Sequence, residues 1–313
     1  MKNVLHILSL CLLCLYPLGM WAQFDVHFTH YWALQGYTNP AVAGSTEQMN
    51  IMATYSMQMA GFTNAPATML IAVDSPFPTQ RKEHAFGVGM LSDKVGLYNN
   101  QRIYGSYAYR MDLWGGKLAV GASAGVLQGK FDGTKVEAEE RNDPAIPSAS
   151  VEGNSLDVGA GLYYTIRNCY LGLAAMHLTA PDMKLGETNE IHIDRCYNLN
   201  AGCNIRLKNP LLSLQPSMQL MTDLQTWRAD VTMRGTYTYD EKKYYAGVTY
   251  SPLVSVAVLL GAEINGVRFG YAYELFTQGV GLLYGSHDIF LGYVTDMDMF
   301  KKGKNKHKSV RVL

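Results

Sequence analysis

This sequence of 313 residues has no excess of charge of one sign, few long apolar runs and no regular spacing of its cysteines. Lys and Arg together number 26, as do Asp and Glu, so the formal net charge is zero. A neutral chain argues against nucleic acid as a main partner. Beyond the first 22 residues, no apolar run reaches the roughly twenty residues that a transmembrane helix needs. The three cysteines that follow them, Cys169, Cys196 and Cys203, are odd in number and irregularly spaced, so we expect no disulfide framework.

The N-terminus is the exception to the shortage of apolar runs. Lys2 gives a positive start, residues 4–20 are nearly all apolar, and Ala22 precedes Gln23. This order is typical of a secretory signal peptide. We therefore expect cleavage after Ala22, so that the mature chain begins at Gln23.

Constellations that carry catalysis or hold metals are also scarce. His177, His192 and His287 are far apart in the sequence and share no metal-ligand spacing, which favours interfacial histidines at strand ends. The Gly-x-Gly at 87–89 lacks a following helix, so it is no phosphate loop. The Gly-Ala-Ser-Ala-Gly around Ser123 lies inside an alternating strand and not at a strand-to-helix turn. We expect no enzymatic activity, no cofactor and no metal site.

Period-two alternation of apolar and polar residues is what the sequence has in abundance. Between residues 228 and 240, Val231 and Met233 share an apolar face, while Thr232 and Arg234 share a polar one. Such alternation predicts β-strands. The predicted strands cover 49–57, 66–75, 84–92, 101–112, 117–128, 155–166, 169–178, 195–208, 211–222, 228–240, 243–251, 254–263, 266–274 and 286–295.

An even number of strands of about ten residues is typical of a bacterial outer-membrane barrel. Apolar residues would face lipid, and closure would satisfy the backbone groups that an open edge leaves unpaired. We therefore predict an all-β fold, an antiparallel transmembrane β-barrel of about fourteen strands. It would span residues 49–295, between an N-terminal lead (23–48) and a C-terminal tail (296–313).

Turn length predicts the orientation of the barrel in the outer membrane. Very short turns near 114–116, 167–168, 208–210, 240–242 and 265–266 would share one rim, which in such barrels is periplasmic. Both termini would then be periplasmic. The longer connections, about 129–154, 179–194 and 275–285, would face outward, although the turn near 76–83 is longer than its periplasmic neighbours.

Polar positions on the alternating strands are candidates for the lining of the lumen. Inward charges more often fill and hydrate a lumen than perform chemistry, but a selectivity role is also possible. The candidate lumen-lining residues are Asp157, Asn200, Arg206, Arg228, Asp230, Arg234 and Arg268.

Two segments lie outside the predicted wall. The lead is rich in aromatic residues and contains Asn39, Pro40 and Gly44, a candidate plug or partner motif; it would fold into the lumen or pack on the barrel end. The tail is strongly basic and is either solvated or a docking element for an acidic periplasmic partner. Its candidate docking residues are Lys301, Lys302, Lys304, Lys306, Lys308 and Arg311.

Several short motifs, in a fixed order, resemble one known family. They include Asn-Pro-Ala-Val-Ala-Gly at 39–44, Gln-Met-Ala-Gly-Phe at 58–62, Ser-Asp-Lys-Val-Gly at 92–96 and Asn-Asp-Pro-Ala at 142–145. The order is similar to that of the PorP/SprF membrane proteins of the type IX secretion system in Bacteroidetes, over nearly all of the mature chain. Met59 departs from the pattern, since the family usually has Trp there.

This resemblance implies an outer-membrane component of the secretion or gliding machinery. Its implied partners are the periplasmic ring, OmpA-like lipoproteins that bind peptidoglycan, and secreted or surface-anchored adhesin cargo. A non-enzymatic secretion component predicts an obstructed lumen and a partner-binding rim. The alternative, a diffusion channel for small solutes, predicts an open lumen. We favour the secretion component because of the ordered motifs and the aromatic lead.

Overall fold

The computed structural model describes residues 25–62, 64–77, 83–136, 149–186, 189–278 and 284–296. The predicted signal peptide and the basic tail beyond residue 296 lie outside the described residues. No helix in the described part is long and apolar enough to cross a membrane. Its α-helix α2 (Gln35–Thr38) and the 3-10 helix η1 (Pro40–Val42) are single turns in the lead.

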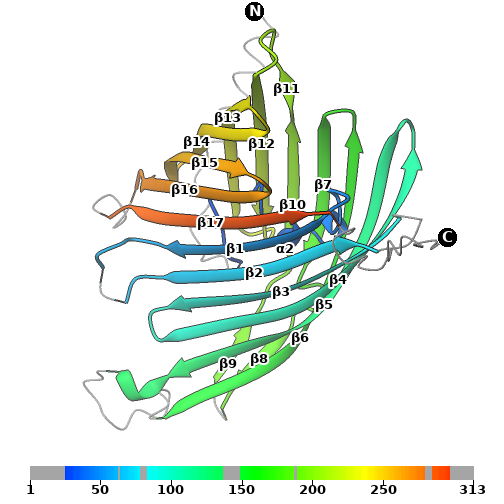
Figure 1. Ribbon diagram of the computed structural model, residues 1–313. Helices are drawn as coiled ribbons and strands as arrows, with labels where there is room; N and C mark the ends of the chain where they lie inside the picture. Colours follow the sequence, from blue (N-terminus) through cyan, green and yellow to red (C-terminus); the bar gives the residue numbers. More distant parts are fainter. Residues whose placement is uncertain are drawn as a thin grey trace, which may run out of the picture.

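One antiparallel sheet closes on itself to form the wall (Figure 1). The first strand, β1, pairs with the last, β17, and β10 pairs with β12. Because β10 and β11 both pair with β12 along one run, the fifteen strands of the sheet form fourteen wall strands, as predicted. The wall strands are β1 (Met49–Met57), β2 (Ala67–Pro76), β3 (His84–Val95), β4 (Tyr98–Leu113), β5 (Gly116–Asp132), β6 (Ser150–Ile166), β7 (Cys169–Met176), β10 (Cys196–Cys203), β11 (Ile205–Arg206), β12 (Leu212–Thr222), β13 (Trp227–Tyr239), β14 (Lys242–Ser251), β15 (Ser255–Ile264), β16 (Val267–Phe276) and β17 (Ser286–Thr295).

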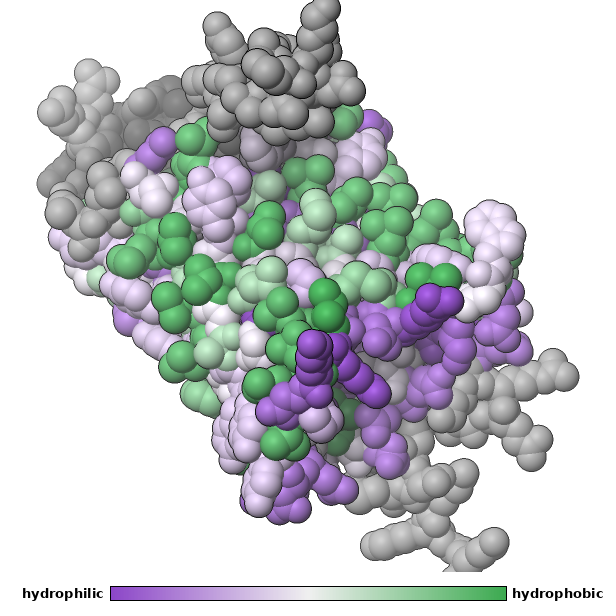
Figure 2. Space-filling model, turned by 90° about the horizontal axis from the view of Figure 1, so that it is seen from above, coloured by the Kyte–Doolittle hydropathy of each residue, from purple (hydrophilic) through white to green (hydrophobic). Residues whose placement is uncertain are grey.

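The two faces of the wall have opposite character, as the alternation predicts. On β13 the side chains of Val231 and Met233 are about half exposed, whereas Thr232 and Arg234 are buried. Apolar residues cover much of the outer surface, and hydrophilic residues gather at one edge (Figure 2). An apolar outer face with a polar interior is the arrangement that lipid contact requires.

Short turns join the strands at one end of the barrel. Trp114-Gly115, Asp240-Glu241 and Asn265-Gly266 have positive φ at both residues, which matches the right-handed twist of the flanking strands in tight hairpins. We call this end the short-turn rim. At the opposite end, β5, β7 and β16 end and β6, β10 and β17 begin, and we call it the long-loop rim.

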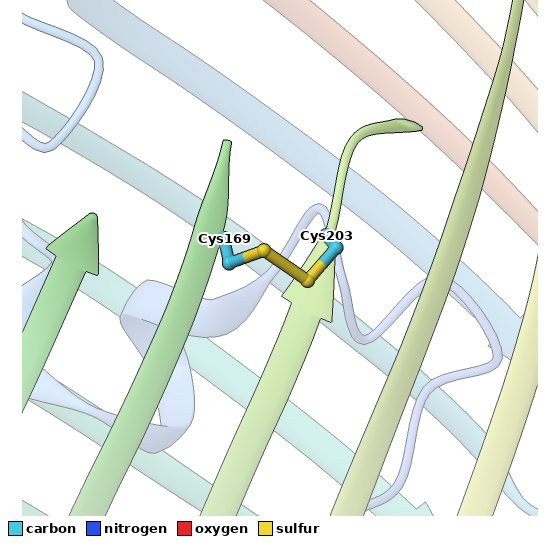
Figure 3. Close-up of a disulfide and its surroundings, with 2 residues drawn as sticks. All are labelled: Cys169 and Cys203. Atoms are coloured by element: carbon cyan, nitrogen blue, oxygen red, sulfur yellow. A yellow bond between two sulfur atoms is a disulfide. The ribbon is translucent and has the colours of Figure 1, made fainter. Parts of the chain in front are cut away.

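One disulfide, which the expectation of no disulfide framework did not include, joins Cys169 and Cys203 (Figure 3). The two residues are direct partners in the register of β7 and β10, with Cα atoms 4.1 Å apart. Spacing along the chain could not reveal this register. The predicted strand 195–208 is also interrupted, because the ladder with β7 ends at Cys203 and Asn204 donates its backbone N–H to Asn168 instead.

We expect the disulfide to stabilise the barrel by limiting the unfolded chain. A Cys169→Ser/Cys203→Ser variant should lose about 3 to 4 kcal/mol of unfolding free energy, the value for a loop of this size. Denaturant unfolding of the two proteins in the same detergent measures the difference. Wild-type protein treated with reductant is the control. The prediction would be contradicted if the untreated wild type, the reduced wild type and the variant unfolded in coincident transitions.

A hairpin that the sequence reasoning missed covers part of the long-loop rim. It consists of β8 (Asp182–Leu185) and β9 (Asn189–His192), in a stretch expected to be an outer loop. Met183 and Ile193 are buried and pack with Leu127 of β5. Another short element, η2 (Gly133–Lys135), follows β5.

Candidate functional site in the barrel lumen

The lead does not trail from the barrel but lies inside it. We call residues 25–48 the plug. Its Phe28, Leu34 and Tyr37 are buried in one apolar cluster with residues of the wall. The wall residues of this cluster are Met52, Leu70, Ala72, Leu91, Tyr104 and Phe290. Burial of several large apolar side chains is the main force that holds in place a segment with only single helical turns of its own.

The middle of the plug is fixed by Asn39. Its side-chain amide donates to the carbonyl of Leu162, at 3.0 Å, and lies 3.4 Å from that of Leu173. Its Oδ1 accepts the N–H of Ala41 and so caps η1. Pro40 occupies the first position of η1, where a missing N–H costs nothing. One buried amide thus joins the plug to both β6 and β7.

The C-terminal end of the plug is held at the short-turn rim. The backbone N–H of Gly44 donates to Asp74 on β2, at 2.7 Å. The guanidinium of Arg110 on β4 donates to the carbonyl of Ala43, at 3.0 Å. Glu47 and Lys117 form an exposed ion pair beside them. These contacts lead the chain directly into β1.

The N-terminal end of the plug is held by buried charges at the long-loop rim. His177, which follows β7, donates from Nδ1 to Asp157, at 2.8 Å, and its Nε2 lies 3.7 Å from the carboxylate of Asp25. Arg102 on β4 also pairs with Asp157, at 2.6 Å. The hydroxyl of Tyr37 donates to Asp25, at 3.0 Å. A buried pair of this kind is costly to break, because the remaining partner is left as an unpaired charge.

A second charge network anchors the next residues of the plug. His27 Nε2 lies 3.2 Å from Asp230 on β13. Arg228 joins Asp230 to Glu274 on β16, through contacts of 3.2 and 3.0 Å. The backbone N–H of Thr29 donates to Asp288 on β17, at 2.7 Å.

Arg234 is buried in the lumen against an aromatic residue of the plug. Its guanidinium carbon lies 3.3 Å from the centre of the Trp32 ring and 5.9 Å from that of Tyr245. Cations are attracted to the faces of such rings, most strongly where water is excluded. The plug thus contacts the wall through apolar, amide, ionic and cation–π interactions.

The sequence-predicted lumen residues differ in their positions. Asp157, Asn200, Asp230 and Arg234 are buried on the inner face, and Arg228 and Arg268 lie half-buried there. Arg206 lies on β11 at the short-turn rim and is exposed. The plug motif Asn39, Pro40 and Gly44 lies in the lumen. The tail positions Lys301 to Arg311 lie outside the described residues.

Sequence reasoning missed Arg102, Arg110, Asp25 and His177. Arg102 and Arg110 occupy even positions of β4 among buried residues such as Tyr104, so alternation alone could have found them. Asp25 and His177 lie outside the wall strands, where period two carries no information. The interpretation of His177 as interfacial does not match its burial. Among the described residues, no group of three or more His, Cys, Asp and Glu side chains is arranged to hold a metal ion.

Protonation of His177 should control the N-terminal end of the plug. Burial lowers its pKa, but the hydrogen bond to Asp157 and the nearby carboxylate of Asp25 outweigh that effect and raise the pKa from 6.5 to about 9. Because its pKa is raised in the folded state, His177 contributes its full stabilisation below pH 6.5 and loses it as the pH rises through about 9. Burial raises the pKa of Asp25, but its contacts with His177 lower the pKa to about 2. Asp25 therefore keeps its negative charge, and its contact with His177, down to pH values far below neutrality.

We therefore expect this end of the plug to loosen when pH rises through about 9. The alkylation rate of Cys196, a buried free cysteine beside Asp25, measures this loosening. At each pH the rate is divided by that of a free thiol. A His177→Gln variant should show a rate increase of roughly tenfold or more already at neutral pH. A His192→Gln variant, altered on the exposed hairpin, is the control. Equal rates in all proteins would contradict the prediction.

Comparisons with known proteins agree with this architecture. A family model described as type IX secretion system membrane protein PorP/SprF matches residues 21–293. A search of curated proteins gives no match. The toluene transporter TbuX of Ralstonia pickettii has a TM-score of 0.53 and 15% identity, over 89% of this chain and 96% of that chain. The monoaromatic hydrocarbon channel CymD has a TM-score of 0.51 and 15% identity, over 89% and 95%. At these identities the likeness shows the fold alone, and a membrane β-barrel supports an outer-membrane location.

Proposed function

Because the chain belongs to the PorP/SprF family of type IX secretion system membrane proteins, we propose that it is a non-enzymatic outer-membrane component of that machinery. It docks the periplasmic ring and OmpA-like lipoproteins at its short-turn rim. From there it supports the export or surface retention of adhesin cargo. Membership of the family supports the secretion role.

The observation that carries the proposal is the occupied lumen. A barrel that serves as a pore for small solutes needs a continuous aqueous path. Here the plug contacts β2, β4, β6, β7, β13 and β17 through its own side chains and backbone. Apolar burial of Phe28, Leu34 and Tyr37 anchors it at mid-height. A filled barrel is suited to serve as a rigid docking body.

The short-turn rim is suited to face the periplasm and to bind partners. Its tight hairpins follow the usual asymmetry of outer-membrane barrels, in which short turns are periplasmic. Trp114 at the tip of one hairpin is 87% exposed, and an exposed aromatic ring is a common anchor in protein interfaces. Lys117 and Arg167 flank the same surface.

Deletion of the gene in its native host tests the secretion role. We expect the loss of one or more proteins with C-terminal sorting domains from the secreted and surface proteomes. Loss of a single protein indicates a dedicated partner, and loss of many indicates a general component. An unchanged proteome would overturn the proposal in favour of a diffusion channel for small solutes; TbuX is a toluene transporter and CymD a monoaromatic hydrocarbon channel.

The basic tail provides a test of docking at the periplasmic rim. Deletion of residues 301–313 should reduce recovery of an acidic periplasmic partner in pull-downs without unfolding the barrel. Long-range attraction of this kind is screened by salt, so the difference should shrink as ionic strength rises. A tail of the same composition in scrambled order should still bind. Unchanged recovery after deletion would remove the tail from the mechanism.

A further inference from the structure

One hairpin extends beyond its neighbour at the short-turn rim. Cys169 at the start of β7 pairs with Cys203 at the end of β10. Before Cys169 the chain turns at once, at residues 167–168, whereas after Cys203 it continues through residues 204–208 before it returns as β12. Figure 1 shows that the β11–β12 hairpin projects past the β6–β7 hairpin. In the described part of the chain, β11 pairs with β12 on one side and with no strand on the other. We call residues 204–208 the free edge.

The backbone of the free edge directs hydrogen-bonding groups away from β12 at every second residue. Leu207 donates its N–H to the carbonyl of Leu212 on β12, at 3.1 Å. In an antiparallel ladder the neighbouring residues direct their N–H and C=O groups to the opposite side. Asn204 shows this direction, because its N–H donates to Asn168 at the end of the β6–β7 turn, at 2.8 Å. Arg206 is exposed, and its backbone makes no hydrogen bond on that side to a described residue.

The two faces of the free edge differ in character. Ile205 and Leu207 lie on one face, where both side chains are about half exposed. Arg206 and Lys208 lie on the other face and are also exposed. A strand that paired here would place its side chains alternately beside these two faces. Its sequence would therefore alternate between apolar residues and residues that suit a positive charge.

The charge at the free edge is positive after its neighbours are counted. Residues 204–215 contain Arg206 and Lys208 and no Asp or Glu, and the β6–β7 turn adds Arg167 and no acid. The next turn along the sheet, 240–243, contains two acids and two lysines and is balanced. The exposed ion pairs at this rim do not involve the three cations near the free edge. A complementary strand is therefore acidic on one face.

We propose that the free edge binds an extended segment of a periplasmic partner, in which acidic and apolar residues alternate, as an added β-strand. Exposed sheet edges bind peptides in this way, with affinity from backbone hydrogen bonds and specificity from alternate side chains. The free edge is about 17 Å long, and the disulfide between Cys169 and Cys203 fixes its base. This inference rests on the proposed docking at the short-turn rim and names the form that docking takes.

Other segments of the same chain suit the free edge less well. Two copies that paired through this edge would bring Arg206 and Lys208 of one copy close to the same cations of the other. Like charges on neighbouring strands destabilise pairing, and charged side chains on an edge are a common protection against it. The basic tail has the same sign of charge as the free edge. Charge complementarity thus favours an acidic segment of another protein.

Binding of a synthetic peptide to the full-length barrel in detergent tests the site. The probe is a short labelled peptide of alternating valine and glutamate, and fluorescence anisotropy measures its affinity. We expect saturable binding to wild-type protein. A peptide of the same composition, with its valines and glutamates in separate blocks, should bind about tenfold more weakly, because it cannot match both faces. Equal affinities for the two peptides, or no binding of the alternating one, would overturn the proposal whether or not any variant folds.

Two substitutions of Arg206 separate its backbone from its charge. Arg206→Gln keeps the N–H and should weaken binding of the alternating peptide about threefold, as expected for one exposed charge. Arg206→Pro also removes the N–H that faces the free edge, and should weaken binding about tenfold further. Proline is tolerated there because that N–H is not bonded to β12. Lys242→Gln, which removes a charge at the next turn, is the matched control and should bind like the wild type.

Equal affinities of folded Arg206→Gln and Arg206→Pro variants would overturn strand addition, because the peptide would then bind through charge alone. The gel shift of folded barrels identifies the folded variants. Light scattering tests self-pairing, and a wild-type dimer that Arg206→Pro separates would overturn the proposal in favour of a second copy. Tighter peptide binding after deletion of residues 301–313 would do so in favour of the tail. A changed proteome in the deletion strain without peptide binding would leave the secretion role in place and reject only this form of docking.

Discussion

A variant that lacks residues 24–45 is expected to turn a silent barrel into a conducting one in planar lipid bilayers. Without the plug, inward-facing groups such as Asn200, Asp230 and Arg234 lose their contacts and become hydrated. A wall of fourteen strands encloses enough space for water once nothing else fills it. Wild-type protein should give background current, and the variant should give resolved stepwise currents.

The matched control for this deletion removes the outer hairpin instead. A variant that lacks residues 182–192 opens the long-loop rim but keeps every contact of the plug described above. We expect it to remain silent. Stepwise currents from this variant, or from wild-type protein, would show that the plug is not the barrier and would favour the channel alternative. Both variants must first show the gel shift of a folded barrel.

The wall is the part of this fold that the sequence predicts best. The predicted ranges 49–57 and 286–295 coincide with β1 and β17, which pair to close the barrel. Alternation is informative here because a shift of one residue would move every apolar side chain of a strand from lipid to the lumen. The side-chain faces predicted for 228–240 therefore agree with the burial along β13.

Contacts between distant parts of the chain are what alternation cannot predict. Cys169 and Cys203 meet because they are direct partners in the register of β7 and β10. The spacing of cysteines along the chain does not predict that register. The pairing of His177 with Asp157, and with Asp25 of the plug, depends equally on closure of the barrel. The aromatic content of the lead indicated burial, but its position in the lumen required the three-dimensional fold.

The wall also specifies where the plug lies, and glycine substitutions can test this without a change in the plug itself. A Cβ atom at Gly121 on β5 would lie 2.3 Å from the backbone nitrogen of Ala41, and one at Gly161 on β6 would lie 2.1 Å from Oδ1 of Asn39. Gly121→Val should therefore push η1 off the wall, because the atoms that it meets belong to backbone. Overpacking of this kind typically costs about 1 to 3 kcal/mol.

We expect Gly121→Val and Gly161→Val to make the plug sensitive to protease and to give intermittent currents in bilayers, while the barrel stays folded. Valine itself suits a strand, so a loss of function would not come from the wall strand. Gly235→Val is the matched control, since nothing lies within 4 Å of a Cβ at that position on β13. If Gly121→Val behaved like this control in both assays, η1 would not be held against β5, and the occupied lumen would lose its structural basis.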